Sequence, residues 1–192
     1  MKKLSSILMI AAVGLMLQAC GGPKDSTDAA DSLNAVKDTT TNGSTGIGVV
    51  ADDAQFAVNA ANGSMTEVET SKLAAAKATN ASVKEFAAMM ISDHSKANDE
   101  LKGLAATKNI TLPDSVNADS KSALADLSKK AGADFDKAYV DKMVSDHKAT
   151  VDLFESGSKD VKDPDMKAFI DKTLPSLRAH LEHINKIHDG LK

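Results

Sequence analysis

Two segments of this sequence repeat the pattern Met-aliphatic-Ser-Asp-His, "MISDH" at 90–94 and "MVSDH" at 143–147. An aromatic residue, Phe86 or Tyr139, precedes each histidine by eight positions. On an α-helix, positions i, i+4 and i+8 lie along one face, so the ring, the thioether and the imidazole point the same way. The serine and the aspartate are rotated toward other faces. The repeat therefore predicts two inward-facing histidines, one on each of two helices.

Two further groups are expected to face the same interior. His180 lies about 60° from the centre of an apolar arc on the last predicted helix, at ~100° per residue. Glu67 falls among small residues on the inward stripe of the first helix, where a buried carboxylate needs a partner. Imidazole nitrogens and a carboxylate oxygen suit Zn, Fe, Cu or Mn. The candidate metal ligands are Glu67, His94, His147 and His180.

Another interpretation fits the same residues, in which they are core polar groups that hydrogen-bond one another. Carboxylate-bridged di-iron proteins place a glutamate three positions before a histidine on two helices. The residues at that spacing here are Ile91, Val144 and Leu177, which argues against such an oxidase. Asp93 and Asp146 are rotated ~100° from their histidines and are expected to be solvated. No phosphate loop or nucleophile elbow is present, so no catalytic residue is assigned.

The elements that must position these groups show a 3.6-residue period and no strand alternation. Long helices are predicted at about 52–79, 82–108, 133–157 and 164–188, with a shorter one at 117–130. Links between the first two and the last two long helices are short, and the middle link is long. An all-α, ferritin-like four-helix bundle of two antiparallel hairpins and a crossover is expected. Pro175 is expected to kink the last helix.

The N-terminal segment has the layout of a bacterial export signal. Lys2 and Lys3 precede a short apolar stretch, and "LQAC" ends at Cys20, the only cysteine. We expect a lipoprotein signal peptide at 1–19, a lipidated Cys20, and a flexible polar linker over 20–50. A helical domain at 51–190 completes the predicted organisation.

Charge narrows the range of partners. Loss of residues 1–19 removes two lysines and no acid, so the formal charge changes from -4 to -6. A mildly acidic chain without a basic cluster is unlike a nucleic-acid-binding protein. Acyl chains on Cys20 are expected to hold the protein at a membrane, and Gly21 is typical of sorting to the outer membrane. The expected localisation is the cell envelope, with the domain facing the periplasm.

The motifs also resemble a known bacterial family. Three segments resemble domain of unknown function 4142, a family labelled predicted outer membrane protein. They are the segment that begins at Glu67 and contains "MISDH", "FDKAYVDKMVSDHKATVDLFE" (135–155), and "MKAFIDKTLPSLRAHLEHI" (166–184). The resemblance implies a ferritin-like helical bundle in an exported protein and carries no established activity. The family's pattern residues fall here on Glu67, Asp93, His94, His147, Pro175 and His180.

Three functions remain open from the sequence. The first is a non-enzymatic, lipid-anchored envelope or stress-related protein that binds one transition-metal ion through the Glu/His cluster. The second is a metal-dependent redox enzyme that uses the same cluster with an open coordination position. The third is a structural or interaction module whose histidines only fill the core. Convergence of the three imidazoles with Glu67 would argue against the third.

Overall fold

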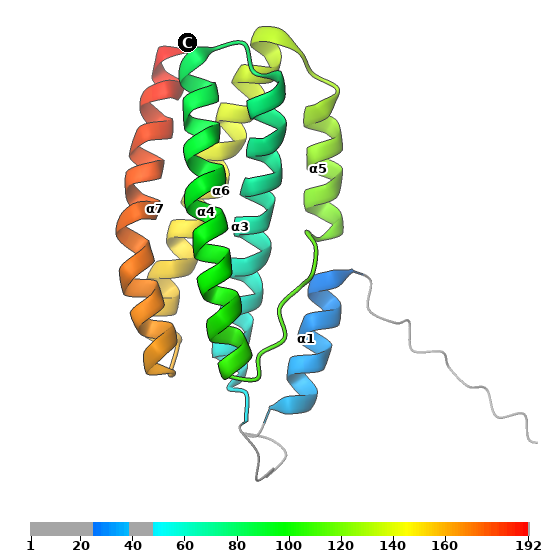
Figure 1. Cartoon of the computed structure of the whole chain (residues 1–192), viewed down its shortest axis with the longest axis vertical. Coiled ribbons are helices and arrows are strands. Elements are labelled where there is room, and N and C mark those ends of the chain that lie inside the picture. Colours follow the sequence, from blue (N-terminus) through cyan, green and yellow to red (C-terminus); the bar gives the residue numbers. More distant parts are fainter. Residues whose placement is uncertain (1–24, 39–47, 192) are drawn as a thin grey trace, which may run out of the picture.

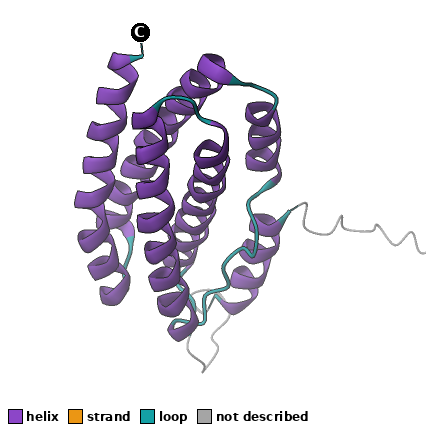
Figure 2. Ribbon diagram, turned by 45° about the horizontal axis from the view of Figure 1, so that its top comes forward, coloured by secondary structure: helices purple, strands orange, loops and turns teal. Residues whose placement is uncertain are grey.

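The computed structural model describes residues 25–38 and 48–191, which form six helices and no strand (Figures 1 and 2). This confirms the predicted all-α class. None of the described helices is long and apolar enough to cross a membrane. The helices are α1 (Ser26–Lys37), α3 (Ala51–Lys77), α4 (Ala81–Thr107), α5 (Ala118–Ser128), α6 (Gly132–Asp160) and α7 (Pro164–Gly190).

The four long helices, α3, α4, α6 and α7, lie side by side, with α3 and α7 running in one direction and α4 and α6 in the other (Figure 1). Short links join α3 to α4 and α6 to α7, whereas the link between α4 and α6 is long and carries α5 along the outside (Figure 1). Side-chain oxygens cap the starts of these helices: Asn80 at α4, Asn117 at α5 and Asp163, followed by Pro164, at α7.

Two buried aspartates tie the helical hairpins together. Asp136 of α6 accepts hydrogen bonds from the backbone amides of Thr79 and Asn80, in the link between α3 and α4. Asp53 of α3 accepts the amides of Lys162 and Asp163, in the link between α6 and α7. Each hairpin therefore supplies the carboxylate that satisfies the turn of the other. The partners are related by a constant offset of 83 positions in the sequence (136 against 53, 162 against 79).

The core consists of two apolar clusters with a polar layer between them. One cluster surrounds Phe56, Phe154 and Phe169 and contains the start of α3. The other surrounds Phe86 and Tyr139 and contains the end of α3. The inward histidines and Glu67 belong to neither cluster, although they are as buried as the residues around them. The core thus contains a buried polar layer near the middle of the long helices.

One predicted helix end needs adjustment. The third long helix was expected to end near 157, but α6 continues to Asp160. A Cβ on Gly157 would lie 2.6 Å from the ring of Phe56, so this glycine permits a close helix approach instead of a break. Pro175 lies inside α7, as predicted, and the kink expected there stays a prediction.

The predicted flexible linker over 20–50 is wrong for residues 26–37, which form α1. Asp25 caps this helix, and α1 packs against α3. The buried Asn34 amide donates to the carbonyl of Thr111 at 2.9 Å and accepts the Thr111 amide at 2.7 Å. Polar groups and small side chains hold α1 against the other helices. Its sequence therefore lacks the apolar stripe from which a helix would be predicted. The predicted signal peptide and Cys20 lie outside the described residues.

Candidate metal centre

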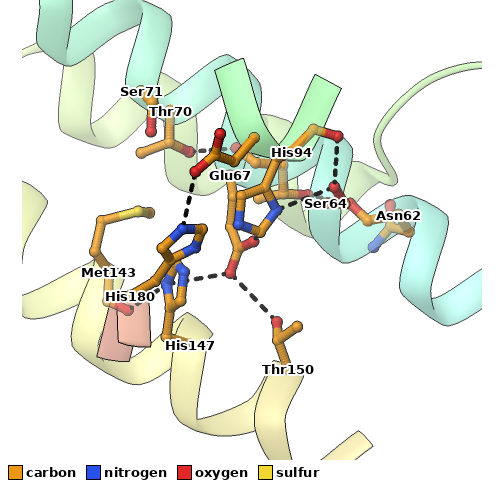
Figure 3. Close-up of polar contacts among 12 residues, drawn as sticks. Asn62, Ser64, Glu67, Thr70, Ser71, His94, Met143, His147, Thr150 and His180 are labelled. Carbon is orange, nitrogen blue, oxygen red and sulfur yellow. Dashed lines mark hydrogen bonds and ion pairs between the residues drawn. The ribbon is translucent and has the colours of Figure 1, made fainter. Parts of the chain in front are cut away.

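The polar layer brings together one group from each long helix. Glu67 extends from α3, His94 from α4, His147 from α6 and His180 from α7, each from near the middle of its helix (Figure 3). Their exposed fractions are 1%, 3%, 0% and 6%. One ring nitrogen from each histidine lies within 4.8 Å of those from the other two. The predicted convergence of the three imidazoles is therefore confirmed.

Each imidazole has one nitrogen held by an acceptor. His147 Nδ1 lies 3.1 Å from the Met143 carbonyl oxygen and 3.4 Å from Glu67 Oε1, so this nitrogen carries the proton. His180 Nε2 lies 3.2 Å from Asp93 Oδ2 and donates to that carboxylate. These contacts fix the orientation of both rings.

His94 is held in the same way from α3. Its Nδ1 lies 3.0 Å from Glu67 Oε2 and 3.1 Å from the Ser64 hydroxyl oxygen. The Ser64 hydroxyl donates to the His94 carbonyl at 3.4 Å, which leaves its oxygen free to accept from Nδ1. His94 Nδ1 thus carries the proton, and Nε2 keeps its lone pair.

The opposite nitrogen of every ring is left with a lone pair and no partner. His94 Nε2, His147 Nε2 and His180 Nδ1 are buried and have no hydrogen-bond partner among the described residues. Leaving a buried polar atom unsatisfied costs about 1–3 kcal/mol, so three together are an appreciable burden on the fold. Three convergent imidazole lone pairs, each backed by an acceptor on its far side, are the arrangement that metal-binding histidines adopt in proteins.

Glu67 lies behind two of the rings. Its carboxylate contacts the protonated Nδ1 of His94 and of His147, and the Thr150 hydroxyl donates to it at 3.3 Å (Figure 3). Burial alone would raise its pKa, but the contact with His94 Nδ1 and the positive charge that His94 or His147 carries when protonated outweigh burial and lower it. The carboxylate therefore remains ionised. Oε1 is engaged by His147 and Thr150, whereas Oε2 has no hydrogen bond among the described residues although it lies 3.0 Å from His94 Nδ1. Because neither oxygen joins the three nitrogens that lie within 4.8 Å of one another, this geometry favours a role in orienting and polarising the imidazoles, and direct ligation stays a prediction.

Two of the histidines have pKa values shifted toward the neutral form. Burial lowers the pKa of His147 below its usual value, and the nearby Glu67 charge only partly offsets this. Burial also lowers the pKa of His180, and a proton on His94 or His147 would lower it further by repulsion. Neutral imidazoles have lone pairs ready at neutral pH, so a metal ion competes with few protons there.

Asp93 differs from its expected place as a solvated charge. It is 43% exposed, yet its inner oxygen holds His180 Nε2. Asp146, in the matching position of the other repeat, pairs with Lys142 at 2.9 Å and has a pKa raised by burial. Ser64 and Thr150 also contact the cluster, and sequence reasoning missed both. Their spacing could have revealed them, since Ser64 lies three positions before Glu67 and Thr150 three after His147.

The ring spacing suits one small ion. Ring centroids of the three histidines lie 5.5, 5.5 and 5.8 Å apart. Three imidazoles on a tetrahedral ion, with nitrogens at about 2.0–2.1 Å, would place their centroids about 5.2 Å apart. On such an ion the three nitrogens would lie about 3.3 Å apart, whereas here they lie within 4.8 Å of one another, so binding would draw the rings closer together. The three ligands would leave a fourth position open.

Comparisons with known proteins place the chain in a family and relate its fold to a solved structure. The sequence model described as "Domain of unknown function (DUF4142)" matches residues 38–187. No curated protein matches the chain. The crystal structure of a DUF305 fragment from Deinococcus radiodurans is similar to it, with a TM-score of 0.65 at 9% identity. This similarity covers 73% of the present chain and 97% of that chain, and it concerns the fold alone.

The family match covers the segment that carries all the clustered groups, including Glu67 and His180, and it confirms the resemblance read from the motifs. Since it spans well over half of the sequence, this chain belongs to the DUF4142 family.

Proposed function

We propose that the protein binds one divalent transition-metal ion through His94 Nε2, His147 Nε2 and His180 Nδ1. The carrying observation is that the three histidines bring one ring nitrogen each within 4.8 Å of the others, and that each ring has one buried nitrogen with no partner among the described residues while its opposite nitrogen is held by an acceptor. A polar core without a ligand role would be expected to pair these nitrogens with each other or with neighbouring donors.

The donor set favours particular metals. Imidazole suits Zn²⁺, Cu²⁺, Fe²⁺ and Ni²⁺, whereas Mg²⁺ and Ca²⁺ prefer oxygen ligands. Three neutral nitrogens with an open fourth position match tetrahedral Zn²⁺ best, and Cu²⁺ binds such sites at least as tightly. The Glu67 and Asp93 carboxylates, which lie against the ligand rings, would orient the imidazoles and raise their basicity.

Metal stoichiometry tests this proposal. The purified, untagged chain is stripped with a chelator and titrated with Zn²⁺ or Cu²⁺, and the bound metal is counted by mass spectrometry. We expect one ion per chain, and loss of tight binding in His94→Ala, His147→Gln and His180→Gln. His183→Gln is the matched control, because His183 is exposed on the same helix as His180. Unchanged stoichiometry in the three cluster variants would refute the site.

We also propose that the helical body is a ferritin-like four-helix bundle held at the cell envelope, in the periplasm, by lipid on Cys20, where metal binding serves envelope maintenance or stress tolerance. The support is the "LQAC" motif, the polar segment after it, and the hairpin–crossover–hairpin order of the long helices. Radiolabelled palmitate should enter the wild-type chain and not Cys20→Ser, and the variant should leave the membrane fraction. Equal labelling of both would refute the anchor.

A further inference from the structure

A cavity of about 350 Å³ reaches the three-histidine cluster from the side of α4 and α7. His94 and His180, two of the three proposed metal ligands, form part of its wall. It is open to solvent, and α4 and α7 pack less extensively on each other than α3 packs on α4. A molecule in this cavity would therefore reach the fourth coordination position of an ion held by the histidines.

The inner and outer walls of the cavity differ in chemistry. Leu101, Phe154, Phe169 and Leu177 form an apolar inner wall, and all four are buried by the surrounding helices. The mouth is polar, with Lys172 paired to Glu100 across α4 and α7. The volume lies at the lower end of the range for small-molecule sites, so it suits a compact ligand with one apolar part.

We infer that this cavity binds a small monocarboxylic acid with an aromatic or branched apolar body, whose carboxylate oxygen occupies the open position of the metal. The inference rests on the proposed metal site. Three neutral imidazoles leave the charge of a divalent ion uncancelled within the ligand set, which favours an anionic fourth ligand. The aromatic and leucine side chains of the inner wall would cover the body of the acid.

Co²⁺ makes the inference measurable, because its visible absorption bands report changes in its ligands. The full chain is loaded with Co²⁺ and titrated with phenylacetate, and separately with acetate. Both carry the same carboxylate, but only the first has an apolar body. We expect phenylacetate to shift the bands at a concentration at least about tenfold lower than acetate does. The reason is that binding in the cavity removes the apolar ring of phenylacetate from water.

Ala97→Phe is the first test variant, because Ala97 lines the cavity one turn beyond His94. The added ring should fill the cavity and remove the preference for phenylacetate, while Co²⁺ affinity and the band shift with azide stay unchanged. Ser176→Trp narrows the cavity from α7 and serves if the first variant does not fold. Ala88→Phe is the control, because Ala88 is an exposed alanine of α4 that does not line the cavity.

The outcomes separate the two proposals. Equal response to acetate and phenylacetate, or an unchanged preference in Ala97→Phe and Ser176→Trp, would overturn the cavity inference and leave the metal site standing. Absence of Co²⁺ bands in the wild type would overturn the metal site and the inference with it. Loss of the phenylacetate preference in Ala88→Phe as well would show that the effect is not local to the cavity.

Discussion

Glu67→Gln separates a carboxylate that orients the metal ligands from one that binds the metal. The substitution keeps the shape of the side chain and removes its charge, so packing around it should hold. The glutamine oxygen can still accept from one ring, but His94 Nδ1 and His147 Nδ1 no longer share an ionised acceptor.

The expected magnitude follows from this placement. Loss of a partner behind a metal ligand lowers metal affinity about 10- to 100-fold, equivalent to roughly 1.4–2.7 kcal/mol. We expect Glu67→Gln to weaken Zn²⁺ within that range. The visible spectrum of the Co²⁺ form should stay close to that of the wild type, because its three nitrogen ligands are unchanged.

The assay is competition for Zn²⁺ against a chromophoric chelator at pH 7.5, paired with the Co²⁺ spectrum. Glu69→Gln is the matched control, since Glu69 lies two positions away, has a 46% exposed side chain and pairs with Lys72 on the surface. Affinity within about threefold of the wild type would refute the orienting role. A changed Co²⁺ spectrum would restore Glu67 as a direct ligand, as the sequence predicts.

Three other predictions concern stability, each measured by urea unfolding of the metal-free chain. Burial lowers the pKa of His147 and His180, so below about pH 6.5 the unfolded chain binds more protons than the folded chain. The free energy of unfolding should be highest above that pH and fall as the pH drops, by at most about 1.4 kcal/mol per histidine per pH unit. An equal slope in a variant with both histidines changed to glutamine would contradict this. Asp136→Asn should lower the free energy of unfolding by about 1.5–3 kcal/mol, because the carboxylate oxygens accept several backbone and hydroxyl donors. An unchanged free energy of unfolding would show that the turn does not need the carboxylate. Gly157→Ala should destabilise the fold by about 1–3 kcal/mol, because its Cβ would lie 2.6 Å from a phenylalanine ring. Gly103→Ala, whose Cβ would have nothing within 4 Å, should stabilise it by up to about 1 kcal/mol. Effects of the same sign in the two variants would contradict this packing.

Much of the fold was predictable because packing repeats along the chain with the helical period. The stripe Phe86–Met90–His94 and its counterpart from Tyr139 to His147 are buried as predicted. The predicted starts of the second and fourth long helices, at 82 and 164, also agree within one residue with those of α4 and α7. Helix α1 was missed because its docking depends on hydrogen bonds to a segment about 75 residues later, which periodicity does not record.

The candidate site was predicted at the level of residues and not at the level of roles. Which ring nitrogen is free depends on the acceptors behind it, and these come from other helices or from backbone carbonyls. Asp93 illustrates this, since its partner His180 lies 87 positions away in the sequence. The spacing of Glu67 predicts that its carboxylate faces the same interior as the histidines. It does not predict whether the carboxylate lies behind the rings or beside the metal.

The repeated Ser-Asp-His segments also acquire a different meaning. The hydrogen-bonded turns relate α3 to α6 and α4 to α7 by an offset of 83, whereas the repeat relates α4 to α6. Its two aspartates contact different partners, since Asp93 holds His180 and Asp146 pairs with Lys142. The shared function of the two segments lies in their histidines, which enter one cluster from neighbouring helices.

X-ray absorption of the Zn²⁺-loaded chain tests the three-histidine centre most directly, because multiple scattering from imidazole rings counts them around the ion. We predict three imidazoles with Zn–N distances of about 2.0–2.1 Å and one further light-atom ligand, with one imidazole fewer in His180→Gln. A first shell of oxygen ligands with one imidazole or none would contradict a metal centre at His94, His147 and His180.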